Sequence, residues 1–366
     1  MELERGRIGY SQLALLMIGY VIGPSIILVP AANANQDAWI AILLSIIEGI
    51  ILFLAGMVLS TRFKGKNLVQ INKIVYGPYV SKLISLAYLW FLFHVSTLIL
   101  TTFKDFFLVT TLPQTPSLVI TMVIMLVCAY AVKNGIEVIA RCGQILVIAS
   151  IFSFFISTFF LVKQYHMENL LPVFEIPWKN LLAEQHGAAT FLFGDTIVFL
   201  MIIPYLNPKN GKGIFKLTAA AFFLGGLLVA MVAIRNIGVL GMMNRINLYP
   251  TFQADRLINI GNLLTRLEIF TVTGFLAMGF INLSILFYAT VLGGAELFGL
   301  RSYRPLILPV GILIALVAVI NFKNITGVTR FAQQIYPIYT LPFQVGLPLL
   351  TFIIALVRGL PDKRGA

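Results

Sequence analysis

The sequence predicts an all-α integral membrane protein of ten transmembrane helices, built as a 5+5 inverted repeat in which helices 1 and 6 are discontinuous. Three observations lead to this fold class. Of the 366 residues, 59% are hydrophobic and only 11% are charged, whereas soluble domains contain roughly 25% charged residues. Ten apolar segments each approach the length of about 20 residues that a bilayer requires. The first and sixth segments are interrupted by glycine and proline at corresponding places.

The ten spans follow one another closely, so we expect a single polytopic domain over residues 1–366. An even number of spans places both termini on one side, and the loops on that side hold most of the 26 basic residues, which predicts cytoplasmic termini. We expect no cleaved signal peptide, because the first helix can serve as its own insertion signal. The two five-helix repeats are predicted at 8–163 and 187–358. The predicted spans are 8–33, 38–60, 81–109, 116–133, 138–163, 187–207, 213–239, 267–297, 304–321 and 330–358.

The first span contains an interruption that needs a reason. From Gly19 to Pro30 it reads GYVIGPSIILVP, with two glycines and two prolines inside what would otherwise be one helix. An unpaired backbone amide in hydrocarbon costs several kcal/mol, so a broken membrane helix survives only where it lines a cavity or a polar site. The stretch therefore predicts one half of a ligand site.

The sixth span repeats this pattern. It reads GAATFLFGDTIVFLMIIPYL, so that Gly194 and Pro204 correspond to Gly23 and Pro30 of the first span. An odd number of spans in each half forces the halves into opposite orientations, as in inverted-repeat transporters with two discontinuous helices. In such folds the exposed amides and carbonyls of the half-helix ends can hold the carboxylate and the ammonium group or cation of a ligand.

Several short motifs then suggest a family. The stretches QLALLMIGYVIGPSIILVPAA, DAWIAILL, LPQTPSLVI, GIEVIAR, LYPTF and TRLEIF occur in this order along the chain. Together they resemble the B subunits of nutrient germinant receptors, the spore germination permease-like proteins of endospore-forming bacteria. The resemblance implies the LeuT/APC-like fold of the amino acid–polyamine–organocation superfamily and a place in the spore inner membrane. It also implies two partners, an A subunit with membrane helices and a C-subunit lipoprotein.

The resemblance implies a ligand site where the two interruptions meet at the bilayer midplane. The superfamily's first-helix break often reads Gly-Ser-Gly; this chain has Gly-Pro-Ser there, and proline supplies no amide donor. Its sixth-helix pattern of an aromatic residue, a glycine and an acid is Phe-Gly-Asp at 193–195, and helices three and eight usually wall the site. The candidate ligand-binding residues are Ile22, Gly23, Pro24, Ser25, Tyr88, Phe91, Phe191, Phe193, Gly194, Asp195 and Asn282.

Three ionisable residues inside spans are candidate coupling or switch groups, because such groups are expensive in a bilayer and usually functional. Asp195 could bind a ligand ammonium group, titrate as a proton site, or cap a helix end. Glu48 has no basic residue within its own span, so it is protonated, paired across helices, or a coupling group. His94 is either a hydrogen-bonded interhelical residue or a proton relay.

These observations favour a germinant-sensing subunit that binds a small nutrient and signals to its partner subunits. An amino acid is the favoured nutrient. A proton- or sodium-coupled amino acid permease is the alternative, since fold does not settle function. No nucleotide-binding, hydrolase or metal-ligand motif is present, so we expect no enzyme, cofactor or metal. The net charge of +12 is explained by basic loops beside the bilayer rather than by nucleic acid.

Overall fold

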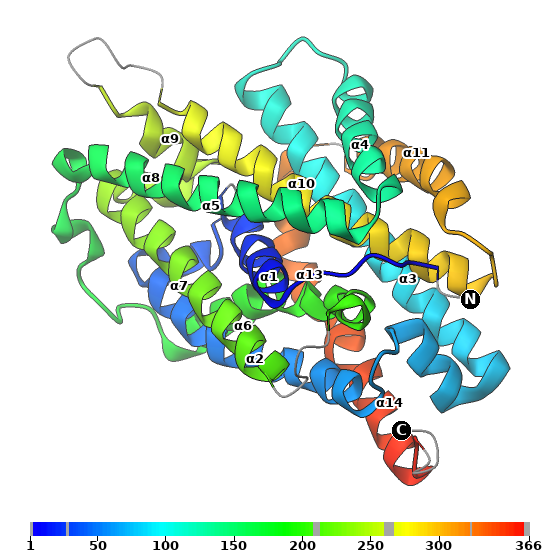
Figure 1. Cartoon of the computed structure of the whole chain (residues 1–366). Coiled ribbons are helices and arrows are strands. Elements are labelled where there is room, and N and C mark those ends of the chain that lie inside the picture. The colour runs from blue at the N-terminus through cyan, green and yellow to red at the C-terminus, as the bar shows by residue number, and fades with distance from the viewer. Residues whose placement is uncertain (1–2, 27–28, 208–212, 260–266, 323, 362–366) are drawn as a thin grey trace.

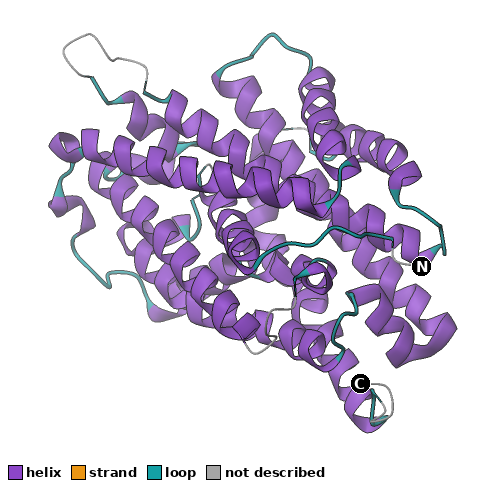
Figure 2. Ribbon diagram, viewed as in Figure 1, coloured by secondary structure: helices purple, strands orange, loops and turns teal. Residues whose placement is uncertain are grey.

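The computed structural model describes residues 3–26, 29–207, 213–259, 267–322 and 324–361. In these ranges the chain forms helices that pack side by side and are joined by short loops (Figures 1 and 2). Six helical stretches in the described ranges are long and apolar enough to cross a membrane, and two shorter apolar helices accompany them. The six are Ala32–Arg62, Leu68–Thr110, Ile136–Phe160, Ile214–Leu240, Ile269–Leu297 and Ile325–Val357; the two shorter ones are Ser117–Lys133 and Arg304–Ile320. The expectation of an all-α membrane protein is therefore confirmed.

The first part of the chain contains five α-helices and one short 3₁₀ turn. The first α-helix ends at Ser25, so it continues through Gly23 and Pro24 and stops just beyond the predicted interruption. Described residues 29–31 are not helical, and the chain then turns through η1 into the second helix. The elements are α1 (Tyr10–Ser25), η1 (Ala32–Asp37), α2 (Ala38–Arg62), α3 (Leu68–Thr110), α4 (Ser117–Lys133) and α5 (Ile136–Phe160).

The second part contains the other interruption and several bends. The sixth helix ends at Leu192 and continues as the 3₁₀ segment η4, while the last membrane stretch contains two π-helical turns. Its elements are η2 (Val162–Gln164), η3 (Met167–Leu170), α6 (Trp178–Leu192), η4 (Gly194–Met201), η5 (Ile203–Tyr205), α7 (Ile214–Leu240), α8 (Met243–Ile246), α9 (Pro250–Arg256), α10 (Ile269–Leu297), α11 (Arg304–Ile320), α12 (Ile325–Arg330), η7 (Phe331–Ile335), α13 (Tyr336–Leu341), η8 (Pro342–Gly346) and α14 (Leu347–Val357).

Two helix starts differ from the predicted spans. The α3 segment begins at Leu68 instead of residue 81, where Asn67 and Gln70 form a reciprocal cap, and it consists of two consecutive helices joined at Gly77, whose backbone is not helical (φ 76°, ψ −174°). The α6 helix begins at Trp178 instead of residue 187. Its first three turns read WKNLLAEQHG, which is too polar to be recognised as part of a membrane span. Both differences come from helix ends whose residues are less apolar than the spans they extend.

The core is centred on α10, whose residues from Ile281 to Ala295 are all buried. This helix packs against α1, α3, α4 and α5, and α1 fills the space between α10, α5 and α7 (Figure 1). The end of α1 also contacts α6 and η4, so the two interrupted segments meet in the middle of the bundle. Before α1 the chain pairs with the end of the second interrupted segment: Ile8 N–H donates to Tyr205 O (3.0 Å), and Asn207 N–H donates to Ile8 O (2.9 Å).

Gly49 allows α2 to approach the sixth span closely. A Cβ atom at Gly49 would lie 2.3 Å from Cγ of Phe193, whose ring is fully buried and packs against Phe222. We expect Gly49→Ala to lower the free energy of unfolding by about 1–3 kcal/mol, the usual cost of overpacking. The matched control is Gly213→Ala, because no atom of the described residues beyond its chain neighbours lies within 4 Å of the added Cβ there. Thermal unfolding of the two purified variants checks the prediction, which fails if both melt like the parent protein.

Candidate functional site

A small cavity lies where the two interrupted segments meet. Its volume is about 70 Å³, and it is walled by the end of α1, the α6–η4 junction, α3, α10 and the first turns of the last membrane stretch. Most of the wall is apolar or aromatic, including Phe103, Phe275 and Phe331. Among the predicted ligand-binding residues, those that line this cavity are Gly23, Pro24, Phe191, Asp195 and Asn282.

Asp195 is the acidic group of the cavity, and two side chains of the last membrane stretch hold it. The Tyr336 hydroxyl donates to Oδ2, and Gln344 Nε2 donates to Oδ1 at 3.1 Å. The carboxylate is only 6% exposed. Since a carboxylate can accept up to about four hydrogen bonds, these two donors orient Asp195 and leave it capacity for a ligand.

Gln344 also explains how α6 ends. Its Nε2 donates to Thr190 O (3.1 Å), one of the last-turn carbonyls that lack a helical partner. Just beyond the helix end, Phe193 O accepts two hydrogen bonds from Thr196, one from its amide (3.1 Å) and one from its hydroxyl. A Cβ atom at Gly194 would lie 2.0 Å from Gln344 Oε1. Glycine at this position therefore allows Gln344 to reach both the helix end and Asp195.

On the α1 side, Asn282 compensates for the proline in the helix. In a regular helix the carbonyl of Tyr20 would accept from the amide of residue 24, but Pro24 has no N–H. Asn282 Nδ2 donates to Tyr20 O instead, at 3.1 Å. Within the described residues, Asn282 Oδ1 and the Tyr20 hydroxyl are buried without a hydrogen-bond partner. Both residues line the cavity beside Asp195, and unpaired buried polar groups of this kind are costly unless something else binds them.

The other predicted ligand-binding residues lie outside this cavity. Ser25 donates to Ile22 O (2.6 Å), and Ile22 lines a different cavity. Phe193 packs against Gly49, and Gly194 lies against the side chain of Gln344. Phe91 stacks on Phe343 with ring centroids 4.6 Å apart, and Tyr88 contacts the same ring edge-on.

Glu48 and His94, the other two candidate switch residues, also lie away from the cavity. Glu48 accepts hydrogen bonds from two residues of α6, His186 Nδ1 at 2.6 Å and Gln185 Nε2. His94 Nδ1 lies 3.1 Å from the Tyr339 hydroxyl, and its ring stacks on Trp90. Each residue is thus bonded across helices in the way that one of the sequence interpretations expected.

Sequence reasoning missed the residues that hydrogen-bond to Asp195 and Asn282, namely Tyr20, Tyr336 and Gln344. The signal for Tyr20 was available, because it stands four residues before Pro24 and must lose its helical hydrogen bond. Tyr336 and Gln344 carry no local signal, since they lie 141 and 149 residues beyond Asp195. Only the fold shows that they share one site with it.

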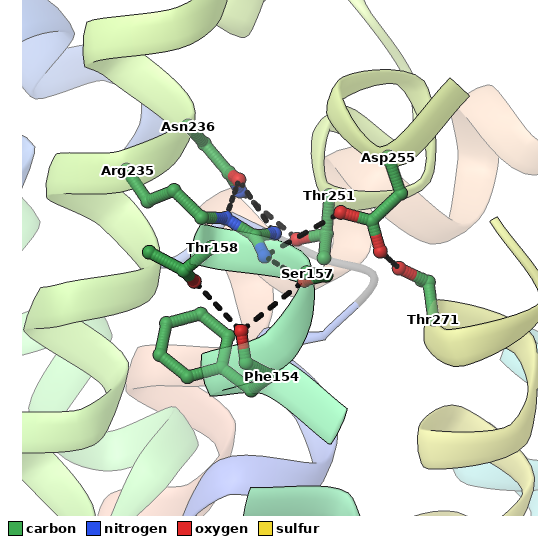
Figure 3. Close-up of polar contacts among 8 residues, drawn as sticks. All are labelled: Phe154, Ser157, Thr158, Arg235, Asn236, Thr251, Asp255 and Thr271. Atoms are coloured by element: carbon green, nitrogen blue, oxygen red, sulfur yellow. Dashed lines mark hydrogen bonds and ion pairs between the residues drawn. The ribbon is translucent and has the colours of Figure 1, made fainter. Parts of the chain in front are cut away.

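A second buried polar cluster joins α5, α7, α9 and α10 (Figure 3). Its centre is Arg235, whose Nη1 lies 3.5 Å from Asp255 Oδ1, with both side chains nearly fully buried. Arg235 also donates to Ser157 Oγ (2.9 Å), and Asp255 Oδ2 accepts from the Thr271 hydroxyl (2.5 Å). Burial raises the pKa of Asp255, while the nearby Arg235 guanidinium and the Thr271 hydroxyl oppose that rise. The cluster fixes the short helix α9 to three long helices.

The chain matches the family model described as Spore germination protein over residues 7–326. Among curated proteins, it is 28% identical to spore germination protein KB of Bacillus subtilis (strain 168) over 359 residues, which cover 97% of this chain and 96% of that protein. It is 22% identical to spore germination protein YndE of the same organism over 321 residues, covering 84% and 85% of the two chains. The similarity to spore germination protein KB thus extends over nearly the whole length of the two chains.

Among solved structures, the chain is similar to Mhp1, a nucleobase-cation-symport-1 family transporter determined in a closed conformation with bromovinylhydantoin bound. The TM-score is 0.63 at 15% sequence identity, and the match covers 96% of this chain and 79% of that one. At this identity the likeness shows a shared fold, and it carries no information about the ligand.

Proposed function

Because this chain belongs to the spore germination protein family, we propose that it is a nutrient-sensing subunit of a germinant receptor and binds a small amino acid in the cavity beside Asp195. Family membership makes it a multi-pass integral membrane protein related to germination proteins rather than to enzymes. In this proposal, ligand binding shifts the conformational population of the bundle, and partner subunits of the A and C types read the shift. A tenfold shift requires the ligand to prefer one state by about 1.4 kcal/mol.

The proposal includes a complete topology. It has ten spans in two five-helix repeats, 8–163 and 187–358, with both termini in the cytoplasm. The fold shared with Mhp1 and the interruption of the first and sixth spans support this arrangement. The distribution of basic residues supports the orientation.

The observation that carries the ligand proposal is the pair of unpaired polar atoms beside a carboxylate. Asn282 Oδ1, the Tyr20 hydroxyl and Asp195 can all accept a hydrogen bond, and no lysine or arginine is among the described residues that line the cavity. This set suits an ammonium group, which is a donor of three hydrogen bonds. The aromatic rings around it suit a cation and a short apolar side chain. We therefore propose that the site recognises the ligand by its ammonium end.

Purified protein in sealed liposomes, supplied with a labelled amino-acid mixture under an imposed proton gradient, tests this function. A binding subunit retains about one labelled molecule per protein, and Asp195→Asn abolishes that retention. No retention by the parent protein under any gradient would contradict the proposal.

Removal of the Tyr20 hydroxyl gives a sharper test. We expect Tyr20→Phe to weaken retention of labelled amino acid about threefold to tenfold, the effect of one hydrogen bond, because the ring and its contact with Phe199 remain. The unliganded variant should be as stable as the parent or more so, since a buried unpaired hydroxyl is removed. The control is Tyr88→Phe, which removes another buried unpaired hydroxyl outside the cavity. Equal weakening by both substitutions would remove Tyr20 from the ligand site.

A proton- or sodium-coupled amino acid permease is the second candidate. The shared fold with Mhp1, itself a transporter, is the observation in its favour. The same liposomes separate the two functions, because a permease accumulates many labelled molecules per protein and releases them when detergent is added.

A further inference from the structure

A second cavity lies next to the one beside Asp195 and shares part of its wall. Its volume is about 340 Å³, and Phe191 and Ala332 line both cavities. It is bordered by the stretch after α1, by α6, by α8 with the residues that follow it, and by α12. In the proposed topology these segments lie at the outer ends of their spans, so we call this space the outer cavity and the one beside Asp195 the inner cavity.

Two side chains of opposite charge line the outer cavity. They are Glu184 of α6 and Arg245 of α8, the charged members of its described lining. Each is held by an amide of the turn η1, since Asn33 Nδ2 donates to Glu184 Oε1 (2.9 Å) and Arg245 Nη1 donates to Asn35 Oδ1 (3.1 Å). Among the ion pairs of the described residues, none joins the two charges to each other. The acid and the base are therefore positioned separately, by neutral side chains of one turn.

Both charged groups keep capacity for a ligand. A carboxylate accepts up to about four hydrogen bonds, and a guanidinium has five N–H donors. The contacts with η1 use one hydrogen bond of each. Hydrogen bonds between ionised partners are roughly twice as strong as those between neutral groups. A molecule with a positive and a negative end can thus bind both side chains without displacing either from η1.

A buried acceptor beside Arg245 also lacks a partner. Asn244 is only 6% exposed, and within the described residues its Oδ1 makes no hydrogen bond. The residue lines the outer cavity. A buried acceptor without a donor costs about 1–3 kcal/mol, which an N–H group bound in the cavity would recover. This atom therefore indicates an occupant that carries hydrogen-bond donors.

The two cavities differ in the ligand groups that they can recognise. No lysine or arginine is among the described residues that line the inner cavity, so its polar groups can recognise only the ammonium end of an amino acid. The outer cavity has acceptors for an ammonium group and a guanidinium for a carboxylate. It can therefore distinguish an amino acid from a simple amine, which the inner cavity cannot.

We propose that the outer cavity is a second binding site, which takes a zwitterionic α-amino acid with its ammonium group at Glu184 and Asn244 Oδ1 and its carboxylate at Arg245. Glu184 is only half-buried and Arg245 is exposed, so water competes for both and the site binds at millimolar concentration. The inference rests on the proposed function in one respect, since the proposed topology makes this the site that an arriving ligand reaches first.

Saturation-transfer NMR tests the site in the full-length Asp195→Asn protein, whose inner cavity has lost its carboxylate. The probes are L-valine, isobutylamine, which lacks the carboxylate, and isovalerate, which lacks the ammonium group. We expect L-valine to bind at millimolar concentration, and each of the other two to show a Kd about threefold to tenfold higher, the effect of one lost contact. Equal Kd values for isobutylamine and L-valine, or no L-valine signal, would overturn the proposal.

Two substitutions in the same protein locate the site. Arg245→Gln and Glu184→Gln keep an amide that can still bond to η1 but remove the charge, so each should raise the Kd of L-valine about threefold to tenfold. The control is Arg256→Gln, because Arg256 is another exposed arginine of the same connection and lines a different cavity. The same Kd in the Arg245→Gln and Arg256→Gln proteins would contradict the proposal.

The outer and inner sites are separated by a second measurement. With Asp195 restored, Arg245→Gln should change the retention of labelled amino acid after washing by less than about twofold, because weakly bound ligand is washed from the outer cavity. A protein that binds L-valine as described but retains no labelled amino acid would contradict the proposed function and support the outer site. Failure of one proposal is thus distinguishable from failure of the other.

Discussion

Asp195→Asn is expected to reduce the retention of labelled amino acid about thirtyfold or more while leaving the fold intact. The carboxylate is buried, and the proposed ligand presents an ammonium group to it, so the substitution leaves a buried charge without its partner. Breaking such a pair costs about 2–5 kcal/mol of binding free energy. Asparagine keeps the size of the side chain and can still accept from Tyr336. Equilibrium binding to the purified protein in liposomes measures the loss.

The control for this substitution is Asp105→Asn. Asp105 pairs with Lys104 at 3.2 Å near the end of α3 and does not line the cavity. We expect its asparagine variant to retain labelled amino acid within about twofold of the parent protein, as for a site with no contact to the ligand. If Asp195→Asn binds as well as the control while its thermal unfolding is unchanged, the ammonium group is not recognised at Asp195.

Arg235→Met is expected to be the most destabilising substitution outside the cavity. It leaves the Asp255 carboxylate buried without its cation and removes the donor to Ser157 (Figure 3). Loss of one member of a buried ion pair costs about 3–5 kcal/mol, which corresponds to a fall of about 4–7 °C in Tm for a chain of this size. Thermal unfolding in detergent or in a bilayer measures the change.

The double variant Arg235→Met with Asp255→Leu tests the reason for that loss. When both charges are removed together, no unpaired charge remains, and replacement of a buried pair by apolar side chains is often neutral or stabilising. Most of the lost Tm should therefore return. The exposed pair of Arg141 and Glu137 is the control, and Arg141→Ala should change the free energy of unfolding by less than about 0.5 kcal/mol. A double variant that melts below the single variant would show that packing, not charge, sets the cost.

The fold class could be predicted from the sequence because composition and apolar length report directly on a lipid environment. The interruptions at Gly23 and Gly194 predicted the position of the candidate site, since backbone breaks in lipid need a reason. The number of ten spans and the inverted repeat remain predictions. The start of α6 was missed because its residues are polar. They form hydrogen bonds to α2 and to a neighbouring turn, and hydropathy along the sequence does not predict such contacts.

Within the site, the sequence identified groups but not their relations. Asp195 was recognisable as an acid in a span, whereas Tyr336 and Gln344, which orient it, lie on a distant helix with no motif. Asn282 was named because of the helix it lies on. Its function follows from a missing amide at Pro24, a relation that exists only after α1 and α10 are packed together. Long-range contacts of this kind depend on the arrangement of the helices, which local patterns do not specify.

The pairing of Ile8 with Tyr205 and Asn207 has a mechanical consequence. It joins the stretch before α1 to the end of η5 and the residues just after it, so the two interrupted segments are held together at one end. Segments clamped at one end can separate only at the other, and their free ends are the ones that border the cavity. Under the proposed function, we expect a ligand that moves those ends apart or together to pivot both segments about the Ile8 pairing. The expected response is then a change in the angle between the two segments rather than an independent displacement of each.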